Sequence, residues 1–128
     1  QYLLDERYMG WAEANVAESG GSLQISHDID AAYKDADVVY AKSWGALPYF
    51  GNWADEKPMR DTLKHFIVDE RKMALTKNGK GLFSHCLPLR RNVKATDGVM
   101  DSPNCVAIDE AENRLHVQKA VMARLLRG

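Results

Sequence analysis

Two short stretches, Val38-Val39-Tyr40-Ala41 and Leu82-Phe83-Ser84-His85-Cys86, decide the fold of this chain. The first is apolar on both faces and rich in β-branched residues, which is typical of a strand buried in a parallel sheet. Leu23-Gln24-Ile25-Ser26 and Cys105-Val106-Ala107-Ile108 predict two more strands. Helical patterns separate these segments, and strands that alternate with helices favour right-handed crossovers. The sequence therefore predicts a mostly parallel sheet.

The predicted helices are marked by residues that favour helix ends. N-cap residues precede the helical patterns at Asp5, at Asp28 or Asp30, at Asp69 and at Thr96. Gly20-Gly21 supplies a left-handed stop, and Pro58 suits the first turn of a helix. Asp109 fits the cap of the C-terminal helix, with Glu112 reaching back. Together these patterns predict an α/β fold with a doubly wound, Rossmann-like sheet and helices on both faces.

The composition excludes several classes of protein. The chain has 128 residues, 45% of them hydrophobic, with 17 Lys and Arg against 18 Asp and Glu and a net charge of −1. Nucleic-acid binding is disfavoured because it needs clustered excess cations. No apolar run approaches the roughly 18 residues of a membrane span, and two cysteines are too few for a disulfide scaffold. We expect a cytoplasmic protein that binds neither nucleic acid nor membranes.

Cationic and thiol side chains follow the predicted strands. They are His27, Lys42, Cys86, Arg90 and, one turn into the last helix, Arg114. Ligands of parallel sheets bind beyond the carboxyl ends of the strands, so these residues predict a basic rim there. Such a rim suits a small carboxylate or phosphate, which Arg binds in a bidentate manner.

Each of these residues also has a purely structural interpretation. Cys86 fits a buried core cysteine, and Arg90-Arg91 fits a solvated corner. Glu110 and Arg114 fit a surface ion pair. His85 and Cys86 make a poor nucleophilic dyad, because adjacent strand residues point to opposite faces. No Cys-x-x-Cys or His-x-x-x-His spacing occurs, so no metal site is predicted. These residues alone predict a small α/β domain that binds an anion.

Two motifs add a more specific signal. His85-Cys86-Leu87-Pro88 is followed by Asp109-Glu110-Ala111-Glu112-Asn113-Arg114-Leu115-His116. In this order the two motifs resemble the C-terminal part of the ornithine-type carbamoyltransferases. Lys42-Ser43-Trp44-Gly45-Ala46-Leu47-Pro48 and Leu87-Pro88-Leu89-Arg90-Arg91-Asn92-Val93-Lys94 are similar to the N-acetylornithine branch of that family. The resemblance extends over essentially all 128 residues.

The resemblance implies a reaction of arginine biosynthesis. A carbamoyl group would pass from carbamoyl phosphate to the side-chain amine of N-acetylornithine, giving N-acetylcitrulline and phosphate. Attack by the amine makes a tetrahedral centre with an oxyanion, which fixed hydrogen-bond donors stabilise. The resemblance further implies that no metal or organic cofactor is needed and that the whole enzyme is a homo-oligomer, a trimer.

The same resemblance implies roles for individual residues. Cys86 and Leu87 would lie against the carbamoyl group, and the Leu87–Pro88 bond would be cis. Arg114 would hold the carbamoyl oxygen, so Cys86 and Arg114 are the expected catalytic residues. Lys94 matches a lysine that carries a carbamate in this branch. The implied substrate-binding residues are Lys42, Cys86, Leu87, Pro88, Arg90 and Arg114.

Motifs of the family's first domain are missing from the chain. Neither a Ser/Met-x-Arg-Thr phosphate loop nor a His-Pro-x-Gln motif occurs. Residues 1–128 are therefore expected to be a partial C-terminal, amino-acid-binding domain. It would lack the carbamoyl-phosphate domain and the first strand of its own sheet, and would be inactive alone. Two alternatives stay open: a stand-alone, non-catalytic, self-associating α/β protein derived from such a gene, and an unrelated small anion-binding domain.

Overall fold

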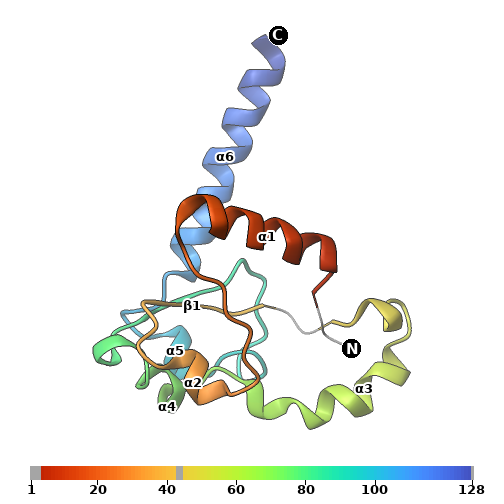
Figure 1. Ribbon diagram of the computed structural model, residues 1–128, viewed down its shortest axis with the longest axis vertical. Coiled ribbons are helices and arrows are strands. Elements are labelled where there is room, and N and C mark those ends of the chain that lie inside the picture. Colours follow the sequence, from red (N-terminus) through yellow and green to blue (C-terminus); the bar gives the residue numbers. More distant parts are fainter. Residues whose placement is uncertain (1–3, 43–44, 128) are drawn as a thin grey trace.

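The computed structural model describes residues 4–42 and 45–127, which form six α-helices and two strands (Figure 1). The helices are α1 (Glu6–Ser19), α2 (Ile29–Tyr33), α3 (Trp53–Thr62), α4 (Glu70–Met73), α5 (Asp97–Met100) and α6 (Ala107–Arg127). The strands are β1 (Val38–Tyr40) and β2 (Leu82–Ser84). Short 3-10 turns are η1 (Leu47–Tyr49), η2 (Lys64–Phe66) and η3 (Lys77–Gly79).

The sheet is parallel, as the sequence predicted. β1 and β2 pair in parallel, with Val39 opposite Phe83 and Tyr40 opposite Ser84. On its other side Phe83 forms a single parallel bridge with Cys105 and accepts a hydrogen bond from the Val106 N–H at 2.9 Å. The α/β fold is thus confirmed, with β2 at the centre of its hydrogen bonding.

Two of the four predicted strands are wrong in detail. Residues 23–26 form no strand, because no other described segment pairs with them, and Leu23 and Ile25 are exposed. The predicted strand at residues 105–108 is reduced to the Cys105 bridge. It stops there because the Glu110 N–H donates to the Val106 carbonyl and α6 begins at Ala107. Asp109 consequently lies in the first turn of α6, not at its N-cap.

Most helix caps lie where the sequence predicted them. The carboxylates of Asp5, Asp28 and Asp69 and the hydroxyl of Thr96 each accept a backbone N–H from the first turn of their helix. Gly20 ends α1 at a φ of 70°. The prediction for Pro58 is wrong: α3 begins five residues earlier, at Trp53, so Pro58 lies inside the helix, where proline removes one helical hydrogen bond.

The apolar core lies around β2. Phe83 is fully buried and packs in one cluster with Val68, Ala95 and Val99. Val68 N–H donates to the Lys94 carbonyl, and Thr96 N–H donates to the Val68 carbonyl. These bonds hold the segment that follows residues 85–88 against the core. The residues after β2 are therefore joined to the apolar core.

The two longest helices lie largely outside this core. None of the 14 residues of α1 is buried, and Ala107 is the one buried residue of α6. Figure 1 shows α6 extending away from the strands. Its exposed large apolar side chains are Ile108, Leu115, Val117, Val121, Met122, Leu125 and Leu126. Among the described residues, no helix combines the length and apolar character that a membrane crossing requires.

Candidate active site

Side chains from both strand ends meet beyond the sheet. Tyr40 and Ser84 are register partners that end β1 and β2. Lys42 and Cys86 each lie two residues further on, and Lys42 Nζ is 3.5 Å from Cys86 Sγ. The neighbouring Tyr40 hydroxyl and the Lys42 ammonium lower the pKa of the Cys86 thiol. The parallel register therefore brings together two residues that are 44 positions apart in the sequence.

A tight turn follows at residues 85–88. The Leu87–Pro88 peptide bond is cis, and Leu87 has a φ of +44°. The Leu87 N–H donates to Nδ1 of His85 at 2.9 Å. An Nδ1 that accepts this bond belongs to a neutral imidazole with its proton on Nε2. Burial, with Lys42 nearby, lowers the pKa of His85, which keeps the ring in that neutral form.

Arg114 reaches this turn from α6. Its Nη2 donates to the Cys86 carbonyl at 2.7 Å, and its side chain is otherwise exposed. One turn earlier in α6, Glu110 Oε1 accepts from the Tyr40 hydroxyl at 2.9 Å, and Oε2 accepts from the Ser84 hydroxyl. The Glu110 carboxylate raises the pKa of Tyr40 to about 12. Glu110 and Arg114 thus both contact the strand ends, and the surface pairing that the sequence allowed is not formed.

Arg90 and Lys94 line a separate hollow, here called the basic cavity. Its volume is about 400 Å³. Its lining residues are Trp53, Lys57, Arg60, Asp61, Lys64, Arg90, Val93 and Lys94. Lys94 is buried, and this burial, with Arg60 and Arg90 nearby, lowers its pKa to about 8. The predicted rim is therefore divided: Lys42, Cys86 and Arg114 form one group, and Arg90 and Lys94 belong to another.

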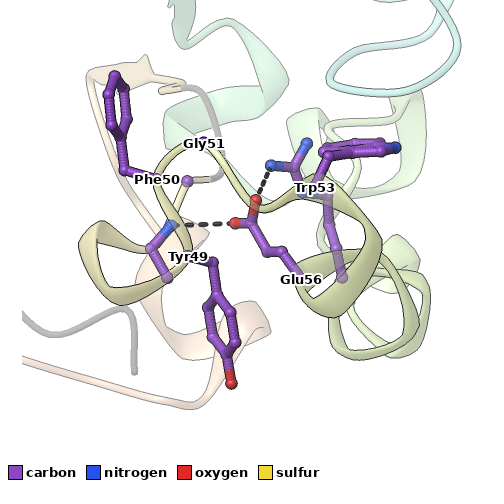
Figure 2. A pocket seen from close by; sticks show the side chains of 8 residues that line it. Tyr49, Phe50, Gly51, Trp53 and Glu56 are labelled. Carbon is purple, nitrogen blue, oxygen red and sulfur yellow. Dashed lines mark hydrogen bonds and ion pairs between the residues drawn. The ribbon is translucent and has the colours of Figure 1, made fainter.

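A second cavity, of about 360 Å³, lies beside the loop after β1. Figure 2 shows the buried Glu56 carboxylate between its two partners: it accepts from the Ala46 N–H at 3.0 Å and pairs with Arg60 at 2.7 Å. The Arg60 guanidinium lies 4.2 Å from the centre of the Trp53 ring. Glu56 and Arg60 thus connect this loop to the wall of the basic cavity. Ser43 and Trp44, part of the motif quoted above, lie outside the described residues.

Among residues 4–42 and 45–127, no group of three or more His, Cys, Asp or Glu side chains is placed to hold a metal ion. The cations and hydrogen-bond donors at the strand ends supply positive charge. Such an arrangement binds anionic groups and stabilises developing negative charge.

The family follows from the comparison with known sequences. The model of the aspartate/ornithine carbamoyltransferase Asp/Orn binding domain matches residues 1–125. The chain belongs to this family. N-acetylornithine carbamoyltransferase of Xanthomonas campestris pv. campestris is 81% identical over 98% of the chain, and ornithine carbamoyltransferase of Pyrococcus abyssi is 47% identical over 99%. The chain spans 36% and 39% of the length of these two relatives.

Solved structures of carbamoyltransferases share the fold. A crystal structure of acetylornithine transcarbamylase complexed with acetylcitrulline matches 97% of the chain with a TM-score of 0.87 and 81% identity. A variant of N-acetyl-L-ornithine transcarbamylase complexed with carbamyl phosphate and N-succinyl-L-norvaline matches equally well. In each case the chain covers about 36–37% of the solved protein.

Sequence reasoning missed the polar residues that support the site. The sequence indicated Tyr40 and Ser84 only as strand residues, and nothing in it singled out Glu56 or Arg60. Tyr40 and Ser84 bind Glu110 of α6, which is 70 positions from Tyr40, and Glu56 binds the Ala46 N–H across a loop. One usable signal was present: Glu110 precedes Arg114 by one helical turn, so both must face the same side of α6.

Proposed function

We propose that this chain is the amino-acid-binding part of a carbamoyltransferase that acts on N-acetylornithine. The observation that carries the proposal is the Arg114 contact with the Cys86 carbonyl, beside the cis Leu87–Pro88 bond. It occurs in a chain that is 81% identical to an N-acetylornithine carbamoyltransferase. A guanidinium fixed at this point is suited to an oxyanion formed next to the turn.

The reaction is a displacement at the carbamoyl carbon. The side-chain amine of N-acetylornithine forms the new C–N bond, the C–O bond to phosphate breaks, and phosphate leaves with the electron pair. The amine loses one proton, and the departing phosphate is the base available to accept it. Arg114 donates to the oxygen that becomes negative in the tetrahedral intermediate. Backbone carbonyls of Cys86 and Leu87 accept from the carbamoyl amide, so the Cys86 thiol itself is not the nucleophile.

Substrate recognition falls to the cations. Lys42, beyond the strand ends, and Arg90, in the basic cavity, are both cations suited to a substrate carboxylate. Lys94 has a pKa of about 8, so a fraction of it is a neutral amine near neutral pH. A neutral amine adds to carbon dioxide with loss of a proton. The resulting carbamate on Lys94 would be an anion between Arg60 and Arg90.

The rest of the enzyme supplies what this chain lacks. We place the phosphate-binding groups in a preceding carbamoyl-phosphate domain, and the complete enzyme is a homo-oligomer that works in cytoplasmic arginine biosynthesis. The relatives are almost three times as long as the chain, which supports this division. On this proposal the 128 residues alone transfer no carbamoyl group.

The test is an assay of the full-length protein that contains this chain. With carbamoyl phosphate present, N-acetylornithine should be converted to N-acetylcitrulline and ornithine should react far more slowly. Arg114→Ala should lower kcat by roughly 100-fold or more with folding intact, as removal of one oxyanion donor does. Cys86→Ala should lower it only modestly. Preference for ornithine, or normal turnover in Arg114→Ala, would contradict the proposal.

A further inference from the structure

We infer that Glu110 is a positioning residue, which holds the start of α6 against the ends of both strands so that Arg114 reaches the Cys86 carbonyl. The inference rests on the proposed carbamoyl transfer for its kinetic consequence. The structural claim, that the Glu110 carboxylate determines where the Arg114 guanidinium lies, does not depend on the reaction.

The two oxygens of Glu110 bind one donor from each strand. Oε1 accepts from the Tyr40 hydroxyl at the end of β1, and Oε2 accepts from the Ser84 hydroxyl at the end of β2. Tyr40 and Ser84 are direct register partners, so the two hydroxyls are adjacent across the ladder. A single carboxylate on α6 therefore bridges the sheet at its last paired position.

Arg114 lies on the same side of the helix as Glu110, because residues four apart are neighbours on a helix surface. Its Nη2 donates at 2.7 Å to the carbonyl of Cys86, two residues beyond Ser84. The helix is therefore joined to the chain after β2 at two points: Glu110 binds Ser84, and Arg114, on the same side of the helix, binds the Cys86 carbonyl. Rotation of α6 about its axis would break the Glu110 and Arg114 contacts together.

In the described chain, few other contacts restrain the rotation of α6 about its axis. Ala107 is its one buried residue, and the residues beyond Arg114 are exposed as far as Arg127. Two backbone bonds to Phe83, from the Val106 N–H and to the Asn104 carbonyl, anchor the chain just before the helix begins. Bonds before the first turn do not prevent the helix from rotating about its axis, whereas the Glu110 contacts do. This is why the position of Arg114 depends on Glu110.

A matched control lies two residues further along the helix. Glu112 has the same side chain, is two-thirds exposed, and contacts His116 at 3.5 Å. It makes no hydrogen bond to either strand among the described residues. Glu112→Ala therefore makes the same change of charge and helix propensity without removing a strand contact.

The experiment compares Glu110→Ala with Glu112→Ala in the full-length protein. Glu110→Ala should lower kcat about 10–100-fold, the usual effect of displacing a reacting group by about 1 Å, with a much smaller change in KM. Glu112→Ala should match the unchanged protein. Glu110→Gln retains an accepting oxygen and should lie between the two. Equal kcat in Glu110→Ala and Glu112→Ala would overturn the inference.

A double-mutant cycle separates positioning from general support. If Glu110 acts through Arg114, then Glu110→Ala should add less than about a twofold loss in an Arg114→Ala background. A loss as large as in the unchanged background would mean that Glu110 acts independently of Arg114.

A crystal structure of the Glu110→Ala protein tests the inference without activity. The Arg114–Cys86 contact should be broken, and it should persist in Glu112→Ala. An intact contact in Glu110→Ala would overturn the inference. If the unchanged full-length protein transferred no carbamoyl group, the proposed function would fail, and this structural comparison would still decide the role of Glu110. If Glu110→Ala did not fold, Glu110→Gln and Tyr40→Phe, which remove less, would be compared in the same way.

Discussion

The segment from Val68 to Ala107 and the two longest helices are stabilised in different ways. The segment contains the buried cluster around Phe83, and its backbone is paired on both sides of β2. α1 has no buried residue and depends on its Asp5 cap, its Gly20 stop and an Arg7 side chain over Tyr8. Isolated helices of this length are marginal in water, so most helix stability in proteins comes from packing. Most of the site therefore lies in the packed segment, and α6 contributes to it only through side-chain contacts with that segment and with β1.

Phe83→Ala should have the largest effect on stability. Removal of a fully buried aromatic ring costs about 3–5 kcal/mol, because apolar burial is lost and a cavity remains. Trp11→Ala, which removes a larger but 56% exposed ring from α1, should cost less than about 1 kcal/mol. Chemical denaturation of the two variants measures the difference. Equal losses would show that α1 is packed as firmly as the core.

Lys94→Met should stabilise the protein, by about 1–3 kcal/mol near neutral pH. The native pKa of Lys94 is lowered from 10.5 to about 8, so the unfolded chain binds more protons than the native one between these values. The free energy of unfolding then rises with pH across this window, and below it the native state carries the whole cost of a buried charge.

Lys34, an exposed residue, is the control for this substitution. Lys34→Met should change the free energy of unfolding by less than about 0.5 kcal/mol. Denaturation of both variants near pH 7 and above pH 8 checks the sign. A Lys94→Met protein less stable than its parent would mean that the Lys94 amine makes contacts worth more than its desolvation.

Cap removal should give the smallest effects. Thr96→Ala removes the hydroxyl that accepts the Val99 N–H and should cost about 1 kcal/mol, because α5 belongs to the packed segment. Asp5→Ala should instead lower the helix content of α1, with little change in the unfolding midpoint of the core. Circular dichroism and denaturation on both variants separate these outcomes. A large midpoint shift in Asp5→Ala would contradict the division between the two regions.

Local signals in the sequence predicted local structure well. The caps at Asp5, Asp28, Asp69 and Thr96 lie where the side-chain chemistry placed them, because a cap depends on residues within a single turn. Residues 23–26 failed as a strand, because a strand also requires a neighbour and an alternating pattern carries no information about one. Pro58 failed as a helix start, because proline is compatible with the first turn but does not define it.

The site shows the same division. The strand-end rule brought Lys42 and Cys86 together correctly, because parallel register aligns the residues that follow paired strands. It did not separate Arg90 from that group. Residues 85–88 turn sharply after β2, and the chain beyond them carries Arg90 into the basic cavity with Lys94. A turn of this kind redirects everything after it, and its direction is not encoded in residue spacing.

The basic cavity has a practical consequence for the choice of buffer. Positive side chains gathered around one hollow attract small anions, and an anion that binds only the native state raises the unfolding temperature, more so as the anion concentration exceeds its Kd. Phosphate or sulfate in a storage solution would therefore act as a stabilising additive. If Arg90 binds the substrate carboxylate as proposed, the same ions would compete with the substrate for this cavity, so substrate affinity should be measured without them.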